Sequence, residues 1–153
     1  HYDFVGWNSR LDALQAAYLN LSLSFLSQRI QSRRKAIDFY KKNIKEKDLI
    51  FMNAPSGYFE NGYCSVILIK NLKLKKKVES NLKKNKIGFG NIYPSAMSDQ
   101  PCSKIYSDHH VGSNNSQVIC NSVLNLPIFP YITESELSET IHCVKNSLTK
   151  KND

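Results

Sequence analysis

The sequence predicts an α/β fold in which long N-terminal helices precede an α+β small domain with the order β-α-β-loop-α-β-α. Three observations predict it: helical spacing of apolar residues over residues 10–45, short β-branched runs later in the chain, and a T-x-x-E capping box before the last apolar stripe. The chain has 153 residues, of which 41% are hydrophobic, enough for one domain with its own core. We expect a small sheet of about three strands covered by helices.

Residues 10–45 are predicted to form two helices. Apolar residues that are alternately three and four positions apart form a first stripe along one helix face. Near residues 23–27 the apolar stripe moves to another face and serines interrupt good helix formers, so we expect a break there. Ser9 is expected to cap the first helix, and the basic residues of the second helix are expected to point outward. The first stripe comprises Leu11, Leu14, Tyr18, Leu21 and Phe25; the second comprises Leu26, Ile30, Ile37, Tyr40 and Ile44; the basic residues are Arg29, Arg33, Arg34, Lys35, Lys41 and Lys42.

Three elements are predicted in the middle of the chain. Residues 63–69 are rich in β-branched and aromatic residues and predict a buried strand. Residues 73–86 are strongly basic and carry one apolar seam at i, i+4 and i+8, typical of a surface helix. Residues 87–93 alternate apolar with small or polar residues and predict a second strand that ends at Pro94.

The last third of the chain begins with a long loop over residues 95–113, which has no clear period. A short helix is expected over residues 115–122, with Val118 and Ile119 inward, followed by a strand over residues 123–127. The capping box of residues 133–136 opens a final helix, whose apolar face holds Leu137, Ile141, Val144 and Leu148.

The formal net charge is +8, from 21 Lys and Arg against 13 Asp and Glu. Most of the excess lies on predicted helix faces, and the basic stretches match no nucleic-acid-binding motif. The four cysteines form no C-x-x-C pair, which favours free thiols in a reducing compartment. No apolar run is long enough to span a membrane. The first residues contain neither an initiator Met nor an export signal, so we expect a piece of a longer chain.

Catalytic motifs of other enzyme classes are missing. The chain has no G-x-S-x-G nucleophile motif and no phosphate-binding P-loop. His109 and His110 are adjacent and follow Asp108, and neighbouring loop residues are able to chelate a metal. The sequence does not constrain their geometry or place a further ligand, so a solvent-exposed loop is the simpler interpretation.

The order of several local motifs is more informative. Residues 6–17 read G-W-N-S-R-L-D-A-L-Q-A-A, which resembles the G-x-N-x-R-L-x-x-x-Q-A-A signature of the DegT/StrS-type aminotransferases. Residues 33–40 are similar to the family's R-R-x-x-A-x-x-Y helix, and residues 88–94 to its strand ending in Y-P. Residues 123–137 resemble the L-S-L-P…T-E-x-E-L ending. The motifs occur in order over nearly the whole chain.

The resemblance implies a pyridoxal-phosphate enzyme that transfers an amino group from an amino acid, such as glutamate, to a nucleotide-linked keto-sugar. It implies that residues 1–46 are connecting helices packed on a large domain, and that residues 47–153 are the C-terminal small domain. The family's Schiff-base lysine precedes the G-x-N-x-R motif, so we expect no catalytic lysine, no bound pyridoxal 5′-phosphate and no activity in this chain alone. A homodimer in the cytoplasm is implied, without a nucleic-acid or membrane partner.

The resemblance also implies site residues. Asn8 matches the Asn that reaches across the dimer to the cofactor phosphate, and Arg10 would meet a substrate or cofactor anion or an interface carboxylate. Tyr93, Met97 and Gln100 would border the sugar-nucleotide pocket, with Asp99 a further candidate. Ile92 stands where many members have His, and residues 95–99 depart from the common pattern, which indicates a different sugar or ring position.

Two other function classes are consistent with the sequence. A truncated chain would be a dimerisation or interaction module, because the stripe from Leu11 to Phe25 would be left exposed. A basic nucleic-acid-binding domain would show steeply salt-dependent binding.

Overall fold

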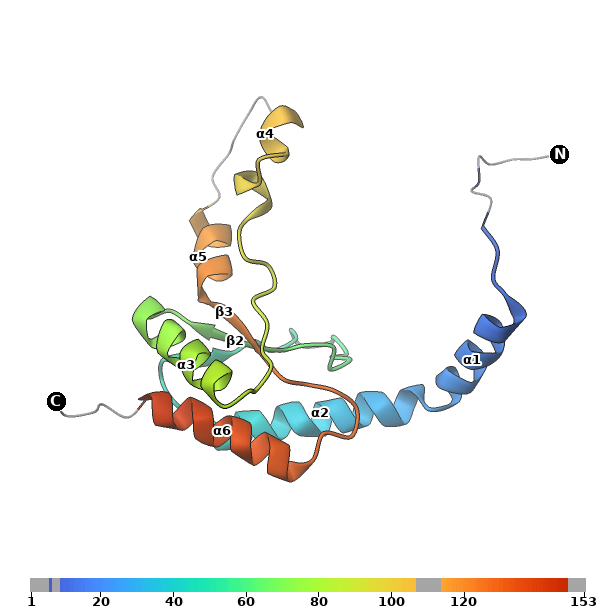
Figure 1. Cartoon of the computed structure of the whole chain (residues 1–153), viewed down its shortest axis with the longest axis horizontal. Helices are drawn as coiled ribbons and strands as arrows, with labels where there is room; N and C mark the ends of the chain where they lie inside the picture. The colour runs from blue at the N-terminus through green and yellow to red at the C-terminus, as the bar shows by residue number, and fades with distance from the viewer. Residues whose placement is uncertain (1–5, 7–8, 107–113, 149–153) are drawn as a thin grey trace.

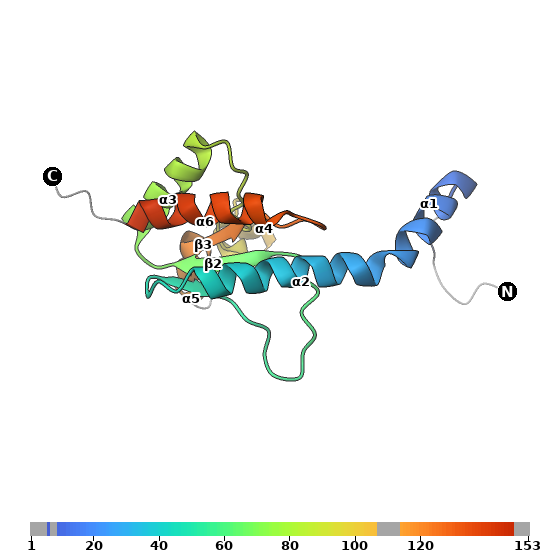
Figure 2. The same cartoon turned by 90° about the horizontal axis from the view of Figure 1, so that it is seen from below.

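The computed structural model describes residue 6 and residues 9–106 and 114–148. Helices α2, α3 and α6 lie side by side against one face of a small sheet, with α6 in the middle (Figures 1 and 2). The α/β fold and the break between the two N-terminal helices are confirmed. The elements are α1 (Ala13–Ser24), α2 (Leu26–Asn43), β1 (Leu49–Phe51), β2 (Ser65–Ile69), α3 (Leu72–Lys84), a 3₁₀ turn η1 (Met97–Asp99), α4 (Ser103–Tyr106), α5 (Asn114–Ser122), β3 (Val123–Leu126) and α6 (Glu134–Leu148).

The sheet has three antiparallel strands in the order β1-β2-β3, so the expected strand number is right, but one strand was misplaced. Residues 87–93 do not form a strand; they make one isolated bridge, in which Gly90 N donates to Asn125 O at 3.0 Å and Asn125 N donates to Gly90 O at 2.7 Å. The third strand is β1, which pairs Leu49 with Ile69 and Phe51 with Ile67. Ile87 and Phe89 pack against the core without forming a strand, whereas β1 pairs with β2 over three residues and buries Leu49.

The core lies between the sheet and its helix layer. Alternate residues of β2 face it, and the C-terminal half of α2 contributes to it directly. Tyr40 is fully buried, and its hydroxyl donates to the carbonyl of Pro127 at 3.0 Å, which ties α2 to the chain after β3. The buried members of this core are Ala36, Tyr40, Ile44, Leu49, Ile67, Ile69, Val78, Leu82, Leu124, Leu126, Leu137, Ile141, Cys143 and Val144.

The two helix starts that the sequence predicted have different outcomes. The capping box before α6 is confirmed: Thr133 N donates to Glu136 Oε2 at 2.8 Å, and Glu136 N donates to Thr133 Oγ1 at 3.3 Å. The Ser9 cap is wrong, because α1 begins at Ala13 with Asp12 as its N-cap and no side-chain capping bond. Ser9 therefore lies too far before the first turn to reach its amide groups.

Three expectations about exposure and loops need correction. Arg33 does not point freely outward: it is half-buried with its Nε enclosed, because the segment around Gly62 packs against it. Val118 and Ile119 do not point inward and are 57% and 46% exposed, since α5 buries no apolar side chain among the described residues. The expected loop over residues 95–113 contains η1 and α4 within its described part.

Two segments extend from this body. Helix α1 projects to one side and contributes no buried residue, whereas the segment from Pro94 to Tyr106 projects in another direction (Figure 1). Phe25 separates α1 from α2. In the described part of the chain, no helix has the length and apolar character needed to cross a membrane.

Candidate functional site

Three of the residues expected at the substrate pocket lie on one segment. Tyr93 and Met97 are 73% and 75% exposed, and Gln100 is half-buried. Gln100 Nε2 donates to Ser95 Oγ at 2.5 Å, which folds residues 95–100 into a compact turn. The structure therefore brings Tyr93, Met97 and Gln100 together on the 93–100 segment and presents the first two to the outside.

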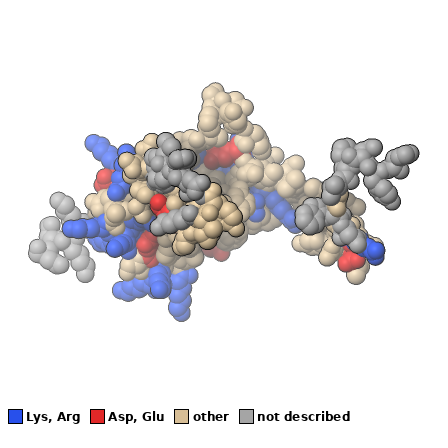
Figure 3. Space-filling model, turned by 90° about the horizontal axis from the view of Figure 1, so that it is seen from above, with Lys and Arg blue, Asp and Glu red and all other residues tan. Residues whose placement is uncertain are grey.

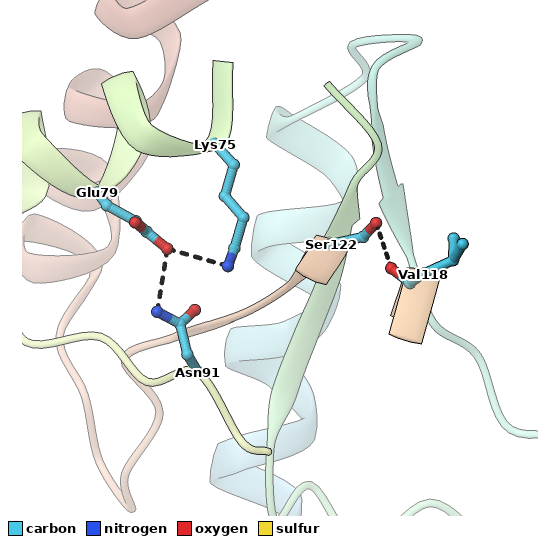
Figure 4. A network of polar contacts seen from close by, with 5 residues as sticks. All are labelled: Lys75, Glu79, Asn91, Val118 and Ser122. Atoms are coloured by element: carbon cyan, nitrogen blue, oxygen red, sulfur yellow. Dashed lines mark hydrogen bonds and ion pairs between the residues drawn. The ribbon is translucent and has the colours of Figure 1, made fainter. Parts of the chain in front are cut away.

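The base of this segment is held by helix α3. Asn91 Nδ2 donates to Glu79 Oε1 at 3.0 Å, and Lys75 Nζ lies 3.2 Å from the same carboxylate oxygen (Figure 4). The side chains of Lys75 and Glu79 are only 12% and 22% exposed, so water and salt screen the attraction between the two charges less than in an exposed pair. Together with the Gly90–Asn125 bridge, it fixes the chain two residues before Tyr93.

The far end of the segment contacts α5. Gln117 Nε2 donates to Asp99 Oδ1 at 3.2 Å, so the additional candidate Asp99 is engaged with a neighbouring helix. Within α5, the Ser122 hydroxyl donates to the carbonyl of Val118 at 2.6 Å (Figure 4). The 93–100 segment is thus supported at both ends by helices.

Arg10 lies elsewhere in the molecule. It is exposed and precedes α1, whereas the 93–100 segment rises from the body on a separate arm (Figure 1). Asn8 lies outside the described residues. Within one chain the structure therefore does not bring Arg10 to the segment of Tyr93, Met97 and Gln100.

Charge is unevenly distributed over the surface. Lys and Arg side chains gather over the body of the molecule, whereas most of the α1 arm is uncharged (Figure 3). Residues 70–86 alone contain eight lysines, but residues 87–103 contain neither Lys nor Arg. An anionic ligand beside Tyr93 would have to obtain its positive partner from a neighbouring element.

The groups with shifted pKa values lie in structural positions. Burial raises the pKa of Tyr40 to about 12, and burial also raises the pKa of the Cys143 thiol. The hydrogen bond from the Thr133 backbone lowers the pKa of the Glu136 carboxyl. These three groups belong to the core and to the cap of α6, so none of them marks acid–base chemistry on the 93–100 segment.

The sequence analysis foresaw neither of the following two pockets. A groove of about 440 Å³ between α2 and the start of α6 is lined by Lys35, Phe39 and Glu134. A second pocket, of about 350 Å³, adjoins Asn91 and Pro94. The i, i+4 spacing of Lys75 and Glu79 was the one signal in the sequence for the second pocket, since such pairs meet on a helix surface.

A cofactor fit can be tested on the described residues. Pyridoxal phosphate needs an enclosed site with phosphate donors and a lysine within reach of its aldehyde. Arg10, Tyr93 and Met97 are exposed, Arg10 lies on a different arm from the other two, and Lys75 is engaged by Glu79. The described residues do not by themselves form such a site, nor do they contain a group of three potential metal ligands.

Comparison with known proteins decides the family. The model of the DegT/DnrJ/EryC1/StrS aminotransferase family matches residues 1–145. The chain belongs to this family. Members of the family depend on pyridoxal phosphate and are enzymes that transfer amino groups.

Relatives of this DegT-family chain include two curated sugar aminotransferases. The UDP-N-acetyl-3-dehydro-α-D-glucosamine 3-aminotransferase of Acidithiobacillus ferrooxidans is 26% identical over 148 residues, covering 97% of this chain and 39% of that protein. The dTDP-3-amino-3,6-dideoxy-α-D-galactopyranose transaminase of Aneurinibacillus thermoaerophilus is 30% identical over 142 residues, covering 92% of this chain and 38% of that protein. The DegT-family chain therefore spans about two fifths of their length.

Solved structures agree with this assignment. A DegT/DnrJ/EryC1/StrS aminotransferase from Brucella abortus superposes with a TM-score of 0.83 at 26% identity, over 98% of this chain and 40% of that one. DesV from S. venezuelae superposes with a TM-score of 0.86 at 18% identity over 98% of this chain and 40% of its own, a likeness of fold alone.

Proposed function

We propose that this chain is the C-terminal part of an aminotransferase that transfers an amino group from an amino acid to a nucleotide-linked keto-sugar. The proposed amino donor is glutamate. The observation that carries the proposal is the family match over residues 1–145, together with the coverage of 39% and 38% of two sugar aminotransferases. In this proposal, residues 1–46 connect to a large domain and residues 47–153 are the small domain.

The substrate is a sugar with its keto group at carbon 3. The names of both curated relatives place the exchanged amino group at this position, although the two enzymes use different nucleotides and different sugars. Tyr93, Met97 and Gln100 would contact this substrate, and their support is their common position on the 93–100 segment, where Tyr93 and Met97 are exposed.

The complete site would combine two copies of the protein. Arg10 and the 93–100 segment lie on separate arms of one chain, which favours a site assembled between subunits of a homodimer (Figure 1). Asn8 would bind the cofactor phosphate of the partner subunit, because it matches the Asn of the family's G-x-N motif and its side-chain amide can donate to a phosphate oxygen. Arg10 would neutralise an anionic group of the substrate or cofactor.

Pyridoxal phosphate would supply the electron sink for amino transfer in the complete enzyme. The described residues of this chain would hold the substrate and close one side of the site, while the Schiff-base lysine would belong to the large domain. The isolated chain is therefore proposed to be inactive and free of cofactor.

Two measurements test this proposal. Sequencing the coding DNA upstream of the His1 codon should reveal an in-frame domain with a Schiff-base lysine; a stop codon directly upstream would contradict the enzyme proposal. In parallel, the purified chain should show no cofactor absorbance after incubation with pyridoxal phosphate. A yellow complex that borohydride reduces to a stable bond with one lysine would show that the chain binds its own cofactor. It would contradict the proposal that the Schiff-base lysine belongs to the large domain.

A further inference from the structure

A pocket of about 350 Å³ lies between the start of α3, the residues around Tyr93 and the end of α5. Its polar lining comprises Lys75, Lys76, Glu79, Asn91, Cys120 and Asn121. Its volume falls at the lower end of the range of small-molecule sites, about 300–1,000 Å³. Because Asn91 and Pro94 both line it, the pocket is continuous with the segment that carries Tyr93.

One side of the pocket offers an unsatisfied hydrogen-bond acceptor. The Asn91 amide nitrogen donates to Glu79, but its carbonyl oxygen Oδ1 is buried and has no hydrogen-bond partner among the described residues. A buried polar atom without a partner destabilises the structure, and a ligand or a water that donates an O–H or N–H to it would remove this penalty. Glu79 adds carboxylate oxygens beside it, so this side favours the hydroxyl groups of a ligand (Figure 4).

The other side offers positive charge. The Lys75 ammonium is mostly shielded from solvent and lies 3.2 Å from Glu79, so these two charges offset each other. Lys76 is exposed at the same pocket and adds a second ammonium, which leaves the lining with a net positive charge. An anionic group such as a phosphate fits this side.

We propose that this pocket binds a phosphorylated sugar, with its hydroxyls on Asn91 and Glu79 and its phosphate on Lys76. The inference rests on the proposed function, since a nucleotide-linked sugar contains this chemistry twice, in the ribose phosphate and in the hexose phosphate. In this proposal Lys76 supplies the positive charge that residues 87–103 lack.

Cys120 provides a direct assay on the intact 153-residue chain. Its half-buried thiol lines the pocket, whereas the exposed Cys102 lies outside the described lining and serves as an internal control. Alkylation by iodoacetamide is followed at each cysteine by peptide mass spectrometry, with UDP, glucose 1-phosphate, uridine or inorganic phosphate present. UDP or glucose 1-phosphate should slow the reaction of Cys120 at least fivefold and leave Cys102 unchanged, and the stronger of the two identifies the half of the substrate that is bound.

Matched variants separate a built site from general charge attraction. Lys76→Gln should weaken protection about tenfold, the equivalent of losing one charge-assisted hydrogen bond. Lys73→Gln removes the same charge from the same helix at an exposed position outside the lining and should change protection less than twofold. Uridine lacks the phosphate and inorganic phosphate lacks the sugar hydroxyls, so each should protect at least tenfold less well.

Three results would overturn the proposal: no protection by either sugar phosphate at millimolar concentration, equal effects of the two lysine variants, or equal protection by inorganic phosphate. None of these results bears on amino transfer, which the upstream coding sequence and the borohydride experiment test separately. Loss of the transferase proposal with retained protection would instead leave a sugar-phosphate-binding chain.

Discussion

Gly62 holds the loop between β1 and β2 against helix α2, and replacing it with alanine tests this contact. Its φ angle is +68°, and an added Cβ would stand 2.8 Å from Arg33 Cβ and 3.3 Å from the backbone nitrogen of Arg34. Both atoms belong to the helix or to the root of a side chain, so they cannot rotate away. The same loop places Phe59 under the Arg34 guanidinium, 4.7 Å from the ring centroid.

The magnitude has two parts. An alanine in the left-handed region costs about 1–2 kcal/mol, of which the lower entropy of the unfolded chain offsets about 0.4–1 kcal/mol. Relieving the close contact with Arg33 requires a shift of the loop or of α2, at about 1–3 kcal/mol. We therefore expect Gly62→Ala to lower the free energy of unfolding by about 2–4 kcal/mol.

Gly57→Ala is the matched control. Gly57 has a φ angle of +85° in the same loop, but an added Cβ would meet no atom within 4 Å. It should therefore cost about 1 kcal/mol, the backbone part alone. Urea denaturation of both variants, followed by far-UV circular dichroism, measures the difference. Equal losses for the two variants would refute the claim that the loop is packed tightly on α2.

Three other outcomes are expected. Burial raises the pKa of Tyr40 to about 12, so the folded chain holds this proton more tightly than the unfolded chain. The contribution of Tyr40 to the free energy of unfolding should therefore stay level below about pH 10 and fall by up to about 3 kcal/mol between about pH 10 and 12. Tyr40→Phe should remove this fall in urea titrations. Thr133→Ala should lower stability by about 1 kcal/mol through loss of the α6 cap and let the Glu136 pKa rise toward its ordinary value, which an NMR carboxyl titration would detect. The purified chain should self-associate through α1, where Leu14 is 87% exposed. In sedimentation experiments Leu14→Glu should shift the chain toward the monomer, whereas the control Gln15→Glu should not. A wild-type chain that stays monomeric at every concentration would contradict self-association through α1.

Local patterns predicted the elements whose signals lie within a few residues. The break near Phe25, the seam of Val78 and Leu82 on α3, and the capping box of α6 all follow from spacing along the chain. The family was also readable from the ordered motifs, and the family match over residues 1–145 confirms it.

The predictions were wrong for the third strand and for the buried face of α5, because both depend on packing between residues far apart in the sequence. Residues 87–93 alternate like a strand, yet only Gly90 pairs with β3, while the inconspicuous β1 occupies the free edge of β2. Val118 and Ile119 have the composition of a buried face, but α5 lies where no described element covers them. The periodicity of apolar residues indicates which side chains share a face of a helix or strand, but it does not indicate which other element packs against that face.

The sequence by itself determined the helices with strong apolar stripes, the residues of most of the core, the caps of α6 and the family, because these depend on short-range spacing and on motif order. The tertiary structure alone decided which segment completes the sheet, that Tyr93, Met97 and Gln100 lie on an arm apart from Arg10, and that Lys75, Glu79 and Asn91 converge on one pocket. The physical reason is that contacts between residues far apart in the sequence depend on the relative placement of helices and strands, which no local pattern encodes.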